Sequence, residues 1–277
     1  MKLLILGYGY TGKAVAEHMR ALGWEVRGTT RNPADDSLLQ WPGCDISATL
    51  AWASHVLVSA APDENGDPFL AGLEAEILAS KPAWLGYLST TGVYGDHGGG
   101  WVDETTPLTP ATTRGHHRVK AEAQWMALHK AHDLPVHIFR LAGIYGPDRG
   151  PFAKVRNGTA RKIIKKNQVF SRIHVEDIAQ TVAASIARPN AGQIYNVCDD
   201  NPAPPQAVIG YAARLLGLPQ PPELDFETAD LSPMARSFYA ESKKVSNARI
   251  KSELGVKLRY PDYPAGLRAL LAQETAR

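Results

Sequence analysis

The sequence predicts an α/β protein organised around a doubly wound parallel sheet. Short apolar segments alternate with helical patterns through residues 1–145, which is typical of strand–helix–strand units. A glycine-rich turn directly follows the first apolar segment. The alternation stops after Gly146-Pro147, where proline becomes frequent. These three observations predict one parallel-sheet domain followed by a smaller, less regular part.

The glycine turn is the most informative stretch of the chain. The apolar run Leu3-Leu4-Ile5-Leu6 leads into Gly7-Tyr8-Gly9-Tyr10-Thr11-Gly12, and a helical pattern follows. A strand, a tight glycine turn and a helix start can seat a dinucleotide diphosphate on the helix N-terminus, as in Rossmann-type folds. One glycine turns the chain, one lets the phosphates approach the backbone, and one lets the helix pack closely. The predicted cofactor-binding residues here are Gly7, Gly9, Tyr10, Thr11 and Gly12.

The later elements follow the same alternation. Their expected positions are strands at 24–30, 44–46, 55–62, 83–89 and 136–141, and helices at 13–22, 69–79 and 112–132. In such sheets ligands bind beyond the carboxyl ends of the strands. Residues at these strand ends are therefore the candidates for a binding site.

The end of the second strand indicates which dinucleotide is bound. Sites that prefer NAD carry an acidic residue about 20 residues beyond the glycine turn, but this chain has Thr30-Arg31-Asn32 there. A carboxylate would repel a 2′-phosphate, whereas a hydroxyl and a guanidinium can bind it. Thr30 and Arg31 therefore favour NADP over NAD. The alternative is that Arg31 is an ordinary solvated surface residue.

Two further strand ends supply cofactor candidates. Asp45 stands where a side chain could meet the adenine, although a turn aspartate is equally compatible with the sequence. Ala60 and Ala61 end the fourth strand, and their small side chains would let a ligand approach the backbone.

The chain after the alternating region is expected to divide between the sheet and a small lobe. Residues 1–150 form the predicted dinucleotide-binding domain, and 171–200, with a helix and a strand, return to it. Residues 151–170 and 201–277 are expected to form a small substrate-binding lobe. We do not expect an independent domain there, because too few apolar residues lie in one block to build a separate core.

Composition narrows the class of protein. The chain has 277 residues, 44% hydrophobic and 21% charged, with a net charge of +2, which is too small to favour nucleic acid or an anionic membrane as a partner. No apolar run approaches the ~20 residues of a membrane span, and the N-terminus does not resemble a signal peptide. Cys44 and Cys198 are expected to be buried thiols, and neither cysteine has metal-ligand spacing. A cytoplasmic protein without a metal and with a small-molecule substrate is expected.

Several motifs together resemble the extended short-chain dehydrogenases/reductases, the NAD-dependent epimerase/dehydratase superfamily. Besides the glycine turn they are Tyr87 to Asp96 (YLSTTGVYGD), Arg140 to Pro147 (RLAGIYGP), Arg172 to Asp177 (RIHVED) and Tyr195-Asn196-Val197. The resemblance covers nearly the whole chain. It implies an NAD(P)-dependent oxidoreductase or epimerase acting on a polyhydroxylated or nucleotide-linked substrate, with a homodimer as the common assembly.

The resemblance also implies where chemistry would occur. The superfamily uses a Ser or Thr, together with a Tyr and a Lys spaced Tyr-x-x-x-Lys on one helix. Thr90 takes the hydroxyl position, with Ser89 beside it as a substrate contact, and Lys120 matches the lysine that holds the nicotinamide ribose. His116 stands where the tyrosine is expected. Arg172 is expected to face the substrate cleft.

The missing tyrosine leaves three interpretations of the site open. His116 could replace it as general acid and base, because histidine titrates near neutrality. Another group or a water could transfer the proton instead. In the third interpretation the protein binds NADP(H) without turnover and acts as a sensor. Alternatively, His116 and His117 are only surface residues on a polar helix face.

Overall fold

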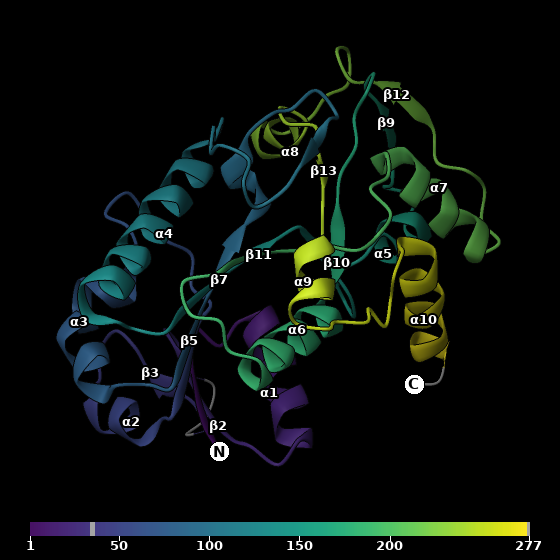
Figure 1. The fold of residues 1–277 in the computed structure, drawn as a ribbon. Helices are drawn as coiled ribbons and strands as arrows, with labels where there is room; N and C mark the ends of the chain where they lie inside the picture. The colour runs from purple at the N-terminus through teal and green to yellow at the C-terminus, as the bar shows by residue number, and fades with distance from the viewer. Residues whose placement is uncertain (34–36, 276–277) are drawn as a thin grey trace.

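The computed structural model describes residues 1–33 and 37–275 and places a seven-stranded sheet at its centre (Figure 1). The strand order is β11-β7-β5-β4-β1-β2-β3, and every pairing is parallel. The strands are β1 (Lys2–Leu6), β2 (Glu25–Thr30), β3 (Leu39–Gln40), β4 (His55–Val58), β5 (Trp84–Thr90), β7 (Val136–Leu141) and β11 (Ile194–Val197). The predicted α/β class with a Rossmann-type doubly wound sheet is confirmed.

Helices cover both faces of this sheet. They are α1 (Tyr10–Ala21) and α6 (Val175–Ala187) on one face, and α2 (Ser47–Trp52), α3 (Pro68–Ser80) and α4 (Thr113–His132) on the other. Successive side chains of a strand point to opposite faces, so Leu3 and Ile5 pack beneath α1 and α6, whereas Leu4 and Leu6 pack on the other side. Within the described ranges no helix is long and apolar enough to cross a membrane.

The remaining elements do not belong to the seven-stranded sheet. They are η1 (Thr91–Tyr94), β6 (Trp101–Val102), β8 (Gly143–Tyr145), α5 (Phe152–Arg156), β9 (Lys162–Ile164), β10 (Arg172–His174), α7 (Pro205–Leu215), β12 (Glu223–Asp225), α8 (Pro233–Phe238), β13 (Lys244–Val245), α9 (Ala248–Ser252) and α10 (Tyr263–Thr275). A third hydrophobic cluster joins α5, α7 and α10 through Phe152, Val208 and Leu267, and these helices lie together on the right of Figure 1. By contrast, Val245 and Ile250 pack into the core beside the sheet.

Two sequence predictions around the third strand are wrong. The strand is Leu39–Gln40, which pairs with Thr29 and Thr30, rather than 44–46. Cys44 is exposed and not buried, because it lies in the turn before α2; Cys198 is buried as expected. The third strand is short enough that its pairing with β2, and not its own residue pattern, defines it.

A buried ion pair ties α4 to the sheet. Glu122 of α4 and Arg140 of β7 lie 2.7 Å apart, and their side chains are only 5% and 3% exposed. Ser89 donates to Glu122 over 2.5 Å, and Arg140 donates to the hydroxyl of Tyr94 over 2.9 Å. That hydroxyl donates to Asn196 over 2.7 Å. The network therefore connects β5, η1, α4, β7 and β11.

Replacing Glu122 with glutamine should destabilise the protein by about 3–5 kcal/mol, because Arg140 would keep a buried charge without its counter-charge. Urea denaturation measures the change. The control is E274Q at the Glu274–Arg156 pair, whose side chains are 38% and 45% exposed; there we expect less than about 1 kcal/mol. Equal losses at the two positions would contradict the prediction.

Candidate functional site

The glycine turn between β1 and α1 lies against the end of β4. Gly7 has φ +95, and a Cβ atom on it would lie 2.9 Å from the Ala60 nitrogen. A Cβ on Gly12 would lie 2.9 Å from the Gly7 oxygen. Beside Gly9, by contrast, no atom of the described chain lies within 4 Å of the Cβ position. The turn is therefore closed on the protein side and open at the residue expected to meet the phosphates.

The start of α1 presents backbone donors. Gly9 is the N-cap residue and provides no side-chain cap. Within the described chain, no hydrogen bond uses the N–H groups of Tyr10, Thr11 or Gly12. Unpaired N–H groups and the helix dipole make such an end attractive to an anion, and the first turn carries no acidic residue.

Tyr10 connects this turn to the segment after β8. Its hydroxyl donates to the Pro147 carbonyl over 2.9 Å, and the Arg149 guanidinium lies 5.4 Å from its ring centre. Burial raises the pKa of Tyr10 to about 12, so the phenol stays neutral at physiological pH. A cation therefore lies beside the residue that opens the anion-attracting helix.

The residues predicted to contact the adenosine half lie at the ends of β2 and β3. Thr30 is half-buried as the last residue of β2, and Arg31 after it is exposed. Asp45 is exposed and accepts hydrogen bonds from the Ser47 nitrogen (2.8 Å) and hydroxyl (2.6 Å), which lower the pKa of Asp45. Asp45 therefore has the geometry of a turn aspartate before α2, and its adenine contact remains a prediction.

The ends of β4 and β5 lie side by side. Ala60 is half-buried and Ala61 is exposed, beyond the end of β4. Thr90 ends β5 and is half-buried, and its hydroxyl oxygen accepts from the Gly92 nitrogen over 3.1 Å. Ser89 is 4% exposed and donates to Glu122. The donor of the Ser89 hydroxyl is therefore used within the protein, and its substrate contact remains a prediction.

Helix α4 brings its first turn beside Thr90 but turns the predicted lysine elsewhere. Gly115 packs on η1, where an added Cβ would lie 3.0 Å from the Gly92 oxygen. His116, the next residue, is exposed. Lys120 is exposed too, and its amine donates to the Glu64 carbonyl over 2.8 Å. The ribose contact of Lys120 and the proton transfer by His116 remain predictions.

Arg118 is the residue of α4 that our sequence analysis missed. Its Nη1 atom donates to the Leu88 carbonyl (2.7 Å), the Tyr87 hydroxyl (2.9 Å) and the Ala60 carbonyl (3.2 Å). The signal was present in the sequence, because Arg118 lies four residues before Glu122 and therefore shares its helix face. Matching the helix to the family's lysine instead directed attention to Lys120.

Arg172 is the first residue of β10, which pairs with β8, and it belongs to a separate polar cluster. Its Nη1 atom donates to the Phe170 and Ala203 carbonyls over 2.9 and 3.0 Å. Asp199 nearby is 1% exposed, and one of its carboxylate oxygens has no partner in the described chain. Burial raises the pKa of Asp199 to about 8. A substrate contact by Arg172 remains a prediction.

This raised pKa has a testable consequence for stability. Between the ordinary value of 3.8 and about 8, folded Asp199 holds a proton that the unfolded chain has lost, so stability falls as pH rises through this window. D199N removes the titration, and we expect a flatter dependence of Tm on pH between pH 5 and 8. D200N, at the neighbouring 40% exposed carboxylate, is the control. A D199N slope equal to that of the wild type would contradict the prediction.

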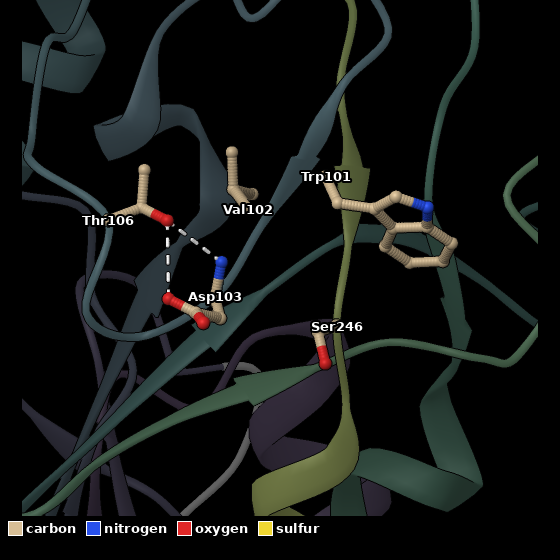
Figure 2. A pocket seen from close by; sticks show the side chains of 5 residues that line it. All are labelled: Trp101, Val102, Asp103, Thr106 and Ser246. Atoms are coloured by element: carbon tan, nitrogen blue, oxygen red, sulfur yellow. Dashed lines mark hydrogen bonds between the residues drawn. The ribbon is translucent and has the colours of Figure 1, made fainter.

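Two surface pockets lie outside the predicted set. One, of about 390 Å³, is lined by Trp101, Val102, Asp103, Thr106 and Ser246 at the β6–β13 pair. Figure 2 shows Asp103 bound to Thr106 and the indole of Trp101 projecting to one side. The other, of about 500 Å³, lies between α5 and α10 and includes Gly146 and Arg149. No residue of the predicted site lines either pocket.

Comparison with known proteins decides the family. The NAD dependent epimerase/dehydratase family matches residues 75–198. Protein YeeZ of Escherichia coli K12 is 32% identical over 288 positions, covering 94% of this chain and 97% of YeeZ. This chain belongs to the NAD dependent epimerase/dehydratase family. The resemblance recognised in the sequence is therefore confirmed.

Solved structures agree with this assignment. A conserved protein from Silicibacter pomeroyi DSS, described as functionally unknown, is 57% identical over 98% of each chain, with a TM-score of 0.93. The dTDP-glucose 4,6-dehydratase of Bacillus anthracis Ames, solved in complex with NAD, is 18% identical, with a TM-score of 0.82 over 100% of this chain and 97% of that one. At this lower identity the likeness shows the shared fold of the epimerase/dehydratase family.

Proposed function

We propose that this protein binds NADP(H) and acts as an oxidoreductase or epimerase of the nucleotide-sugar type, on a polyhydroxylated or nucleotide-linked substrate. The observation that carries this proposal is the open glycine turn, with three N–H groups at the start of α1 that no described residue accepts from. The residues fit a dinucleotide, because Gly9 leaves space for phosphate groups and the helix end attracts their charge. Membership of the family and the NAD complex of the related dehydratase support the same site.

The preference for NADP is proposed from the end of β2. The three consecutive residues there are Thr30, Arg31 and Asn32, and none of them carries a carboxylate. Arg31 is exposed, so its guanidinium is accessible to a 2′-phosphate. A charge-assisted bond of this kind would distinguish NADP from NAD.

We expect NADPH to bind more tightly than NADH in a fluorescence titration, and R31A to lower that preference about tenfold, as the loss of one hydrogen-bonded charge implies. R27A is the matched control, because Arg27 is an exposed arginine of β2, the strand that Arg31 follows, and lies over Trp52 instead. Equal affinities of the wild type for NADPH and NADH would contradict the inference from Arg31.

The chain's own groups would divide the chemistry as follows. The cofactor, when bound, exchanges a hydride with the substrate carbon. The Thr90 oxygen accepts a hydrogen bond from Gly92, so its own proton stays available to orient a substrate oxygen. His116, exposed next to the turn that packs on η1, would take or give the proton at that oxygen.

A non-catalytic NADP(H) sensor is the second candidate. It is favoured by the composition of α4, which contains no tyrosine between Thr113 and His132. The exposed amine of Lys120 donates to the Glu64 carbonyl, whereas Arg118 contacts the β4 and β5 ends. On this interpretation the cofactor binds at the glycine turn but is not turned over.

Turnover assays with nucleotide sugars and aldehydes separate the two candidates. If the first is correct, the wild type oxidises NADPH with, or interconverts the epimers of, at least one substrate class, and T90V and H116A each lower kcat by about 10²–10⁴-fold, the usual contribution of acid–base catalysis. NADPH affinity should stay within about twofold in these variants. H117A is the control. Tight cofactor binding without turnover on any substrate supports the sensor.

A further inference from the structure

One face of α4 is turned towards the sheet. Gly115, Glu122 and Trp125 are buried on this face, and Arg118 is half-buried between them. Steps of three and four residues keep a helix on one side, so these residues form a single stripe. His116 and Lys120, four residues apart, form a different stripe and are both exposed. The cation of α4 that faces the strands is therefore Arg118 and not Lys120.

Arg118 holds two strand ends with one nitrogen. The three oxygen atoms around its Nη1 belong to Ala60, beyond the end of β4, and to Tyr87 and Leu88 of β5. Burial raises the pKa of Tyr87, so its hydroxyl remains a neutral acceptor. Because arginine remains charged throughout the physiological range, this clamp does not titrate away.

The segments that Arg118 binds, the end of β4 and the end of β5, both lie next to the proposed cofactor site. A Cβ atom on Gly7 would lie 2.9 Å from the Ala60 nitrogen, so the β4 end packs directly on the glycine turn. Leu88 precedes the proposed reactive Thr90 by two residues in β5. A shift of Arg118 would therefore move the β4 and β5 ends relative to each other.

Part of the guanidinium is left for a ligand. Arg118 uses only Nη1 in its hydrogen bonds to the described residues, and Nε and Nη2 make none there. Guanidinium groups bind oxygen acceptors through fixed, planar donors. The two remaining nitrogens can thus donate to oxygen atoms of a ligand seated over these strand ends.

We propose that Arg118 is the positioning residue for the nicotinamide half of the cofactor. Arg118 holds the ends of β4 and β5, against which the nicotinamide riboside would lie. The helix that carries Arg118 lacks the family's tyrosine, and its lysine is exposed. The proposal rests on the proposed NADP(H) site. It assigns the nicotinamide half to α4 and leaves the diphosphate and adenosine halves to the glycine turn and β2.

The test compares NADPH with 2′-phosphoadenosine 5′-diphosphate, a fragment that lacks the whole nicotinamide riboside, by calorimetric titration of the full chain. In the wild type we expect NADPH to bind more tightly than the fragment. In R118A, NADPH affinity should fall about tenfold, as the loss of a charged hydrogen-bond donor implies, while fragment affinity stays within about twofold. The NADPH affinity of R118K should lie between those of the wild type and R118A, because an ammonium group cannot reproduce the planar fork of the guanidinium.

K130A is the control, because Lys130 is an exposed cation of the same helix outside the proposed site, and both of its affinities should stay within about twofold. Fragment binding also shows that each variant is folded. Equal weakening of NADPH and fragment in R118A would mean a general structural role and would overturn the proposal, as would unchanged NADPH binding in R118A or an equal selective loss in K130A. If the wild type bound neither ligand, the proposed function itself would fail and this inference with it.

Discussion

The close approach of the β1–α1 turn to the β4 end is the constraint on which the site depends. A side chain on Gly7 would meet the Ala60 backbone, and one on Gly12 would meet the Gly7 carbonyl. Neither contact leaves room for a Cβ. Glycine at both positions therefore lets the start of α1 lie directly over the edge of the sheet. The N–H groups of that helix start, which have no acceptor among the described residues, then lie at the edge where β2, β4 and β5 end.

The rotation of α4 is the second constraint, and the buried Glu122–Arg140 pair determines it. A buried carboxylate without its partner is costly, so the helix keeps Glu122 against β7. Arg118, one turn earlier, must then face the β4 and β5 ends, and Lys120 must face the Glu64 loop. The ion pair, itself outside the proposed site, thereby selects which cation of α4 meets the strand ends.

The sheet and the glycine turn were predictable because both depend on local patterns. An apolar run before three spaced glycines specifies a strand, a turn and a helix without reference to the rest of the chain. The third strand was not predictable, because Leu39 and Gln40 form it only through pairing with Thr29 and Thr30. The role of Arg118 was missed for a similar reason. Which face of α4 is turned to the sheet depends on the pairing of Glu122 in the helix with Arg140 in β7, a contact that no spacing rule predicts.

The combination of a clamping arginine with a missing tyrosine separates binding from proton transfer. In the family's usual pair, a lysine holds the ribose and lowers the pKa of a tyrosine, so one cation serves both tasks. Arg118 can hold the strand ends and donate to oxygen atoms, but it cannot act as a base because it stays protonated. Any proton transfer must therefore come from a neighbouring group such as His116. The His116 side chain is exposed, and its ring makes no hydrogen bond to a described residue. Cofactor affinity and turnover should accordingly respond to different residues of the same helix.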